Sequence, residues 1–175
     1  KILAKEYSIS DILNKKKYFV DDYQREYRWG KRNIDDLLND LWSKFNDSFT
    51  IGDEVEIVKT YNSYFLGSIL ISEKDNNSYL VDGQQRLTSL SLIIIYLYIH
   101  LKEWGLLEEI DDFGQLIYSL SYGKKTFNIQ VPDREKCMEA LFNNQYKEFT
   151  NASENTSSFN LLERYRDIEE FFQDI

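Results

Sequence analysis

The stretch Tyr79-Leu80-Val81-Asp82-Gly83-Gln84-Gln85-Arg86-Leu87 decides how this chain folds. Residues 79–81 form a short, apolar, β-prone run. Residues 87–101 are nearly all apolar, and their length is typical of a buried helix. The polar residues 82–86 therefore mark a junction at which a strand ends and a helix begins.

Such a junction can bind an anion. The first N–H groups of a helix point outward at the positive end of its dipole, and Gly83 lets a ligand approach the backbone closely. Gln84 and Gln85 add amide groups, and the guanidinium of Arg86 can grip a phosphate with two parallel hydrogen bonds. The simpler interpretation is a helix that is capped by Asp82, with Arg86 paired on the surface. The spacing alone leaves both interpretations open.

Composition narrows the class of protein. The chain has 175 residues, of which 42% are hydrophobic and 15% aromatic, and this is enough for one globular domain with its own core. The net charge of −9 disfavours a protein that coats nucleic acid over its whole surface or docks on an anionic membrane. Because the run 87–101 is shorter than the about 20 residues that a spanning helix needs, we expect no membrane segment. The chain begins at Lys1 rather than Met, and we expect it to be a fragment of a longer protein.

The single cysteine and the single histidine limit the chemistry. Cys137 alone cannot form an internal disulfide or a cysteine-rich zinc site, which fits a cytoplasmic protein, and we expect it to be a core residue. His100 lies in the apolar run and is expected to be a hydrogen-bonded structural histidine. With this one histidine, catalytic mechanisms that need histidine are nearly excluded for residues 1–175.

The remaining periodicity predicts an α+β domain. Ser8 or Ser10 is expected to cap a short helix that carries Ile9, Ile12 and Leu13. Apolar residues at helical spacing predict a helix from Asn33 through Phe45, whereas Val55 and Ile57 are candidates for an edge strand. The other predicted elements are strands over 18–20, 64–71, 78–81 and 126–129, with a hairpin turn at 74–77, and helices over 106–120, 132–142 and 159–172.

Three blocks together resemble a known family. They are Tyr23-Gln24-Arg25-x-Tyr27-x-Trp29, Tyr64-Phe65-Leu66-Gly67-Ser68, and Val81-Asp82-Gly83-Gln84-Gln85-Arg86-Leu87-Thr88. In this order they are similar to the N-terminal domain of the GmrSD-type, modification-dependent restriction proteins. The resemblance implies a small mixed sheet packed by helices, of the ParB and sulfiredoxin type. It further implies a nucleotide-binding core over residues 1–105 and a helical extension over 106–175.

The resemblance also implies a function. Domains of this family bind a nucleoside triphosphate, and several hydrolyse it, in proteins that carry a separate C-terminal HNH-type nuclease domain for defence against foreign DNA. Carried over to this chain, the catalytic residues are Asp82, Gln84, Gln85 and Arg86, and the nucleotide-binding residues are Tyr23, Gln24, Arg25, Gly83 and Arg86. The chain has Asp21 where the family commonly has proline, which loosens the entry loop and leaves the chemical groups in place.

The residue types suit that role. Phosphoryl transfer requires cations that spread developing charge, a metal ion, and a group that places water. Arg25 and Arg86 fit the first task, a glutamine fits the last, and Asp82 could hold Mg²⁺ directly or through water. The alternative for Arg25 is a surface pair with Asp22 or Glu26. The aromatic rings of Tyr23, Tyr27 and Trp29 could stack on a base or simply pack, and packing is favoured for Trp29.

One basic segment is a candidate DNA contact. Residues 15–32 carry a local charge of +4, so the rest of the chain carries −13. The alternative is a solvated basic edge. If the segment binds DNA, it contacts phosphates without reading sequence. Besides Arg25, the candidate residues are Lys15, Lys16, Lys17, Arg28, Lys31 and Arg32.

Three function classes therefore compete at this point. The first is a regulatory domain that hydrolyses a nucleoside triphosphate. The second is a non-catalytic module that recognises modified DNA or a partner protein, and the third is a ParB-like enzyme that nicks DNA. Release of phosphate from nucleotide distinguishes the first class from the second.

Overall fold

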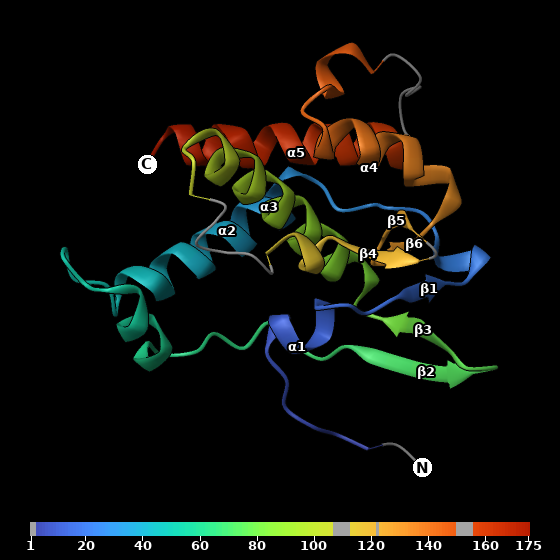
Figure 1. Cartoon of the computed structure of the whole chain (residues 1–175), viewed down its shortest axis with the longest axis horizontal. Coiled ribbons are helices and arrows are strands. Elements are labelled where there is room, and N and C mark those ends of the chain that lie inside the picture. The colour runs from blue at the N-terminus through green and yellow to red at the C-terminus, as the bar shows by residue number, and fades with distance from the viewer. Residues whose placement is uncertain (1–2, 107–112, 122, 150–155) are drawn as a thin grey trace.

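The fold of the chain is given by a computed structural model, which describes residues 3–106, 113–121, 123–149 and 156–175 (Figure 1). The α-helices in these ranges are α1 (Ile9–Leu13), α2 (Lys31–Asn46), α3 (Gln84–Glu103), α4 (Glu135–Phe142) and α5 (Ser157–Gln173). The strands are β1 (Tyr18–Val20), β2 (Leu70–Lys74), β3 (Asn77–Asp82), β4 (Tyr118–Ser121), β5 (Lys124–Phe127) and β6 (Ile129–Gln130). The predicted α+β class is confirmed.

The main sheet is small and mixed, with the strand order β2-β3-β1-β6. Strands β2 and β3 form the predicted antiparallel hairpin, whose two-residue loop is Asp75 and Asn76. Both loop residues have positive φ values of 51° and 61°, the conformation that a type I′ hairpin turn requires and that Asp and Asn tolerate. The central strand β1 runs parallel to β3 on one side and to β6 on the other, with Tyr18 opposite both Ser78 and Ile129.

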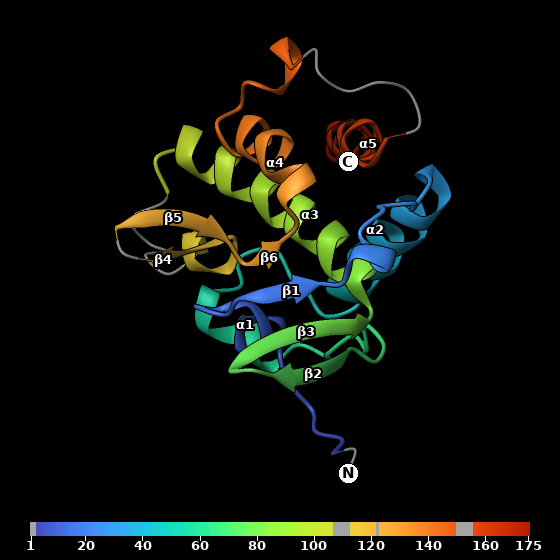
Figure 2. The same ribbon diagram turned by 90° about the vertical axis from the view of Figure 1, so that its right-hand side faces the viewer.

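Helix α3 forms the middle of the core, as the apolar run predicted. From Leu87 to Tyr96 every residue is buried, and α3 packs against α5 and α4 (Figure 2). Its side chains share one hydrophobic cluster with Val20 and Leu80 of the sheet. The helix begins at Gln84, three residues before the apolar run, so the polar cluster occupies its first turn. No helix in the described ranges is long and apolar enough to span a membrane.

The predicted strand over 64–71 is wrong over residues 64–69, since β2 begins only at Leu70. Gly67 has φ +100°, which breaks a strand, and the side chain of Phe65 is 83% exposed. The segment instead passes beside the start of α3, where the Ser68 carbonyl accepts a hydrogen bond from Arg86. Residues 64–69, which were predicted to be a buried strand, therefore form a loop beside the first turn of α3.

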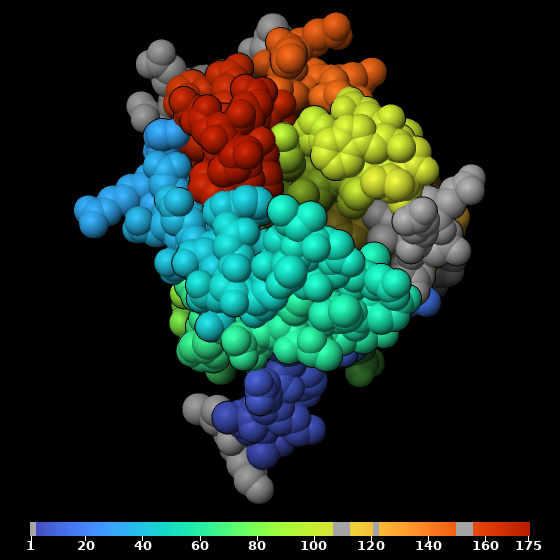
Figure 3. All heavy atoms as spheres, turned by 90° about the vertical axis from the view of Figure 1, so that its left-hand side faces the viewer, coloured from blue at the N-terminus to red at the C-terminus, as the bar shows by residue number. Residues whose placement is uncertain are grey.

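Two further predictions differ from the structure. Residues 55–60 form a 3-10 helix rather than an edge strand, and residues 47–66 cover one face beside α2 (Figure 3). Within the predicted helix over 106–120, residues 107–112 lie outside the described ranges, and the rest is the 3-10 helix Phe113–Leu116 followed by β4. Strand β4 pairs with β5 through a turn at Gly123, with φ +77°, and this pairing overrides a helical spacing of apolar residues.

The other predicted elements agree well with the structure. Ser8 caps α1 with a reciprocal bond to Asp11, and α2 and α5 cover their predicted ranges. The predicted strand over 126–129 is split between β5 and β6, and the helix expected from Pro132 begins as a 3-10 turn before α4. Residues on both sides of the predicted boundary at residue 105 share one sheet and one hydrophobic core, because β6 pairs with β1 and α5 packs on α2 and α3.

Candidate functional site

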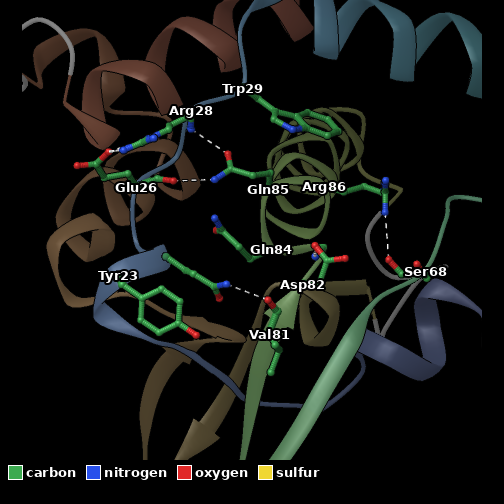
Figure 4. A pocket seen from close by; sticks show the side chains of 12 residues that line it. Tyr23, Glu26, Arg28, Trp29, Ser68, Val81, Asp82, Gln84, Gln85 and Arg86 are labelled. Atoms are coloured by element: carbon green, nitrogen blue, oxygen red, sulfur yellow. Dashed lines mark hydrogen bonds and ion pairs between the residues drawn. The ribbon is translucent and has the colours of Figure 1, made fainter. Parts of the chain in front are cut away.

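A cavity of about 430 Å³ opens where β3 ends and α3 begins (Figure 4). Its walls come from three separate parts of the chain, namely the loop after β1, the segment before β2, and the junction itself. The lining residues are Tyr23, Gln24, Glu26, Arg28, Trp29, Ser68, Val81, Asp82, Gly83, Gln84, Gln85 and Arg86. The fold therefore gathers the predicted residues Tyr23, Gln24, Asp82, Gly83, Gln84, Gln85 and Arg86 around one space.

Gly83 allows the chain to enter α3 at this point. It has φ +84°, and a Cβ atom there would lie 3.1 Å from Ile69 Cγ1 and 3.3 Å from the Ser68 carbonyl oxygen. The first backbone bond of the helix runs from Leu87 N–H to the Gly83 carbonyl. The N–H groups of residues 84–86 precede that bond, so they lack intrahelical acceptors and give the cavity the positive end of the helix dipole.

Arg86 lies over a second glycine. Its Nη1 donates to the Ser68 carbonyl at 3.2 Å, and a Cβ atom on Gly67 would lie only 2.8 Å from that Nη1. No carboxylate in the described ranges pairs with Arg86, so its charge is balanced only by a backbone dipole. This leaves most of the hydrogen-bonding capacity of the guanidinium available at the cavity.

The two glutamines of the junction have different roles. Gln85 uses both ends of its amide, since Oε1 accepts from Arg28 N–H at 2.8 Å and Nε2 donates to the Glu26 carbonyl at 2.6 Å. It therefore fixes the loop 26–28 to the first turn of α3. Gln84 is only 8% exposed, and its Oε1 has no hydrogen-bond partner in the described ranges. Figure 4 shows its side chain reaching into the cavity between Gln85 and Tyr23.

Gln24 and Tyr23 complete the opposite wall. Gln24 Nε2 donates to the Val81 carbonyl at 3.0 Å, and its Oε1 is buried without a partner in the described residues. Tyr23 also lines the cavity, and this residue is 77% exposed. Two buried amide oxygens that lack donors are a feature of a site that a ligand or ordered water completes.

The sequence matches a known protein family over nearly its whole length. The family model described as "GmrSD restriction endonuclease, N-terminal domain" matches residues 9–175. The chain belongs to this family. Among curated proteins, none matches the sequence significantly. The membership confirms the resemblance noted from the three blocks and places this GmrSD N-terminal domain in a restriction-type defence protein. The ParB and sulfiredoxin likeness stays a prediction.

Arg25 is the predicted residue that the structure separates from the rest. It does not line the cavity, because its guanidinium pairs with Asp22 and lies 3.8 Å from Asp133. The surface pair with Asp22 was the alternative that the sequence left open. In this GmrSD N-terminal domain Arg86 lines the cavity and Arg25 does not, so the structure does not bring together the two arginines that were both predicted to bind nucleotide.

Asp82 has a different position from that of a helix cap. Gly83 is the N-cap residue, and Asp82 Oδ1 accepts the N–H of Gly83, which lies before the helix. Its second oxygen remains available at the cavity, while the nearby carboxylate of Glu26 pairs with Arg28. A single hard oxygen donor fits Mg²⁺ that keeps several waters and contacts phosphate. The described residues contain no group of three potential protein ligands, so Asp82 would be the protein's main contribution to such a site.

The predicted DNA-contact residues form two groups along the chain. Lys15, Lys16 and Lys17 precede β1, whereas Arg28, Lys31 and Arg32 follow it. Carboxylates balance the second group: Arg28 pairs with Glu26, Arg32 lies 3.8 Å from Asp36, and Lys31 donates to Glu170 at 2.7 Å. Arg28, Lys31 and Arg32 thus each lie beside a carboxylate, which fits the alternative of a solvated basic edge.

The remaining predictions of residue roles agree with the structure. Trp29 is half-buried and packs against the core, although it also lines the cavity. His100 contacts Glu103 at 3.2 Å and the ring of Tyr96. Cys137 is fully buried, and burial raises the pKa of its thiol to about 12, so the thiol is not an active nucleophile. Sequence reasoning placed neither Glu26 nor Ser68 in the site: Glu26 was only a possible surface partner of Arg25, and the only signal for Ser68 was its place in the second block.

Proposed function

We propose that the cavity at the start of α3 binds a nucleoside triphosphate and that this GmrSD N-terminal domain hydrolyses it. The observation that carries the proposal is the convergence at one helix turn of three free N–H groups, the Arg86 guanidinium and the buried Gln84 amide. The first two supply positive charge and donors to phosphate oxygens, as anion sites at helix starts do. The volume of about 430 Å³ lies within the range of small-molecule sites.

The residues divide the chemical tasks between them. Arg86 would exchange its bond to the Ser68 carbonyl for phosphate oxygens and spread the charge that develops during transfer. Mg²⁺, when bound with the nucleotide, would neutralise phosphate charge, and Asp82 would hold it directly or through water. Tyr23 at the mouth offers an aromatic face to a base.

Gln84 is the better candidate for placing the attacking water. Its amide is held beside the first turn of α3 and has an unused acceptor, whereas the amide of Gln85 is fully engaged with the loop 26–28. We therefore assign Gln84 a catalytic role and Gln85 a positioning role. The sequence alone did not distinguish the roles of these two glutamines.

Family membership supports the wider role. We propose that nucleotide binding here regulates a separate nuclease domain that acts on foreign DNA, and that any DNA contact is made by local surfaces such as Lys15–Lys17. The overall charge of −9 fits such a division, because the domain as a whole does not attract nucleic acid.

Thermal unfolding with a panel of nucleoside triphosphates and Mg²⁺ tests the binding step. At ten times its dissociation constant a true ligand should raise Tm by about 3–6 °C for a domain of this size. Arg86→Ala should abolish this shift and leave the ligand-free Tm close to that of the wild type. Arg32→Ala is the matched control, since Arg32 is exposed on α2 outside the cavity. An unchanged nucleotide shift in Arg86→Ala would contradict the proposal.

Release of phosphate tests the hydrolytic step. Gln84→Ala should retain nucleotide binding and lose turnover, because a contact made only in the transition state lowers kcat more than affinity. Binding by the wild type without any release, with and without Mg²⁺, would instead identify a non-catalytic module.

A further inference from the structure

Arg134 is the most unusual charged side chain outside the cavity. It lies at the end of the 3-10 turn Pro132–Arg134, just before α4, and is only 3% exposed. Its Nη1 donates to the hydroxyl of Thr88 at a long 3.3 Å, whereas Nε and Nη2 have no hydrogen-bond partner in the described ranges. A buried guanidinium with two unsatisfied nitrogens is costly unless something else balances its charge.

No carboxylate in the described residues balances that charge by an ion pair. Asp133, the preceding residue, has a carboxylate oxygen 3.8 Å from Nη1 of Arg25. Burial lowers the pKa of Arg134 to about 10, so the side chain is still charged at neutral pH. The ring of Tyr27, whose centre is 5.9 Å from Arg134 Cζ, gives partial compensation through its π face.

A small pocket lies beside this charge. Its volume is about 60 Å³, and its lining includes Thr88, Gln130, Arg134, Glu135 and Met138. Since one water needs about 10–15 Å³ measured in this way, the pocket has room for on the order of four waters, close to the five non-hydrogen atoms of phosphate. The pocket shares no lining residue with the cavity at the start of α3.

The polar groups of the pocket are suited to oxygen acceptors. Thr88 accepts from Arg134, so its own hydroxyl hydrogen is free to donate. Gln130 uses one amide hydrogen on the Phe127 carbonyl and has a second to offer. Glu135 is exposed and makes no ion pair within the described residues, so its charge opposes an anion only from the rim.

We propose that this pocket binds a small tetrahedral oxyanion of the phosphate type, held by Arg134 with Thr88 and Gln130. The anion supplies the counter-charge that Arg134 lacks, and it lies between α3 and the turn that leads into α4. The site is distinct from the proposed nucleotide cavity, and the inference does not depend on that proposal.

Thermal unfolding in inorganic phosphate tests the site, with ionic strength held constant by chloride. We expect a saturable rise of about 3–6 °C at ten times the dissociation constant. Arg134→Met keeps the length of the side chain and removes the charge, so it should abolish the rise. Arg86→Ala should retain it, which separates this site from the nucleotide cavity. A phosphate shift that survives Arg134→Met in the Arg86→Ala background, where the cavity no longer contributes, would overturn the proposal.

Glu135→Gln gives a second test that does not depend on the folding of a core variant. Removing this rim charge should tighten phosphate binding roughly two- to fivefold, the range of an exposed charge interaction. Glu139→Gln, an exposed change further along α4, is the matched control and should have no effect. If Glu135→Gln lowers the ligand-free Tm and leaves phosphate binding unchanged, Glu135 is itself the counter-ion of Arg134 and the proposal fails.

Sulfate should replace phosphate, whereas a nucleoside triphosphate that competes at this site would show that the phosphate group of a larger molecule enters it.

Discussion

The first turns of α3 have an arginine on each of two sides, and the two arginines differ in exposure and in their contacts. On one side Arg86 faces an open cavity, contacts a backbone carbonyl and lies over Gly67. On the other side Arg134 is buried against Tyr27 and Thr88. The open side is lined by groups that a nucleotide can contact, whereas the side chains of the closed side are buried in the core. Substitutions should therefore affect nucleotide binding on the first side and stability on the second.

The largest contrast should come from two tyrosines of the same block. Tyr27 is fully buried and its hydroxyl bonds to that of Ser89 at 2.7 Å, so Tyr27→Ala should lower the free energy of unfolding by about 3–5 kcal/mol. Tyr23 is 77% exposed, so Tyr23→Ala should change it by less than about 0.5 kcal/mol. Urea unfolding of the two variants measures both. Equal losses would show that the two sides are not distinct.

A pair of glycines separates backbone strain from the loss of the Arg86 position. Gly52 and Gly67 have φ values of +96° and +100°, so alanine at either should cost about 1–2 kcal/mol. Only at Gly67 would the new Cβ meet Arg86, at 2.8 Å, whereas nothing lies within 4 Å at Gly52. Gly67→Ala should therefore also weaken the nucleotide shift in Tm, and Gly52→Ala should not. The same nucleotide shift in both variants would argue against a role for the Arg86 position.

Alkaline pH gives a smaller effect that is specific to the closed side. Burial raises the pKa of Tyr27 to about 12. Above pH 10 the unfolded state releases this proton while the folded state keeps it, so the wild type loses stability as pH rises, by about 1.4 kcal/mol at pH 11 from this group. Tyr27→Phe lacks this loss but also lacks the bond to Ser89, which is worth about 1 kcal/mol. The variant should be less stable than the wild type at pH 8 and about equal to it at pH 11, as measured by urea unfolding. A constant difference between the two would place the hydroxyl in contact with water.

The smallest effect is expected at Asp82. Its carboxylate bonds to Gly83 N–H and does not cap α3, so Asp82→Ala should shift the ligand-free Tm by less than about 2 °C. The change should appear instead in the Mg²⁺ dependence of nucleotide binding. A large loss of ligand-free stability in Asp82→Ala would show that Asp82 acts as a helix cap.

The sequence predicted those parts of the molecule that local chemistry determines. The buried helix 87–101, the Asp75-Asn76 turn and the Ser8 cap follow from periodicity and from residue types that suit one backbone conformation. The junction 82–86 was identified for the same reason, since strand and helix patterns meet there. These predictions required no knowledge of distant contacts.

The errors arose where a distant partner decides the outcome. Residues 64–69 have the composition of a strand, yet Gly67 must curve around Arg86, which is 19 positions away. Gln84 and Gln85 are the same residue type side by side, and only the position of the loop 26–28 shows which amide is engaged. Arg134 carried no signal at all, because neither its burial nor the lack of a counter-ion can be read from its neighbours in the chain.

The central position of β1 in the sheet affects how the domain can fold during its synthesis. This strand has three residues and pairs in parallel with β3 on one edge and β6 on the other, so its partners lie about 60 and 110 positions later in the sequence. During synthesis the N-terminal quarter of the molecule therefore has no complete sheet to join until residue 130 has been made. A chain that is cut short after residue 105 would lack β6, so one edge of β1 would be unpaired. Such an edge is the template on which unwanted pairing between chains begins.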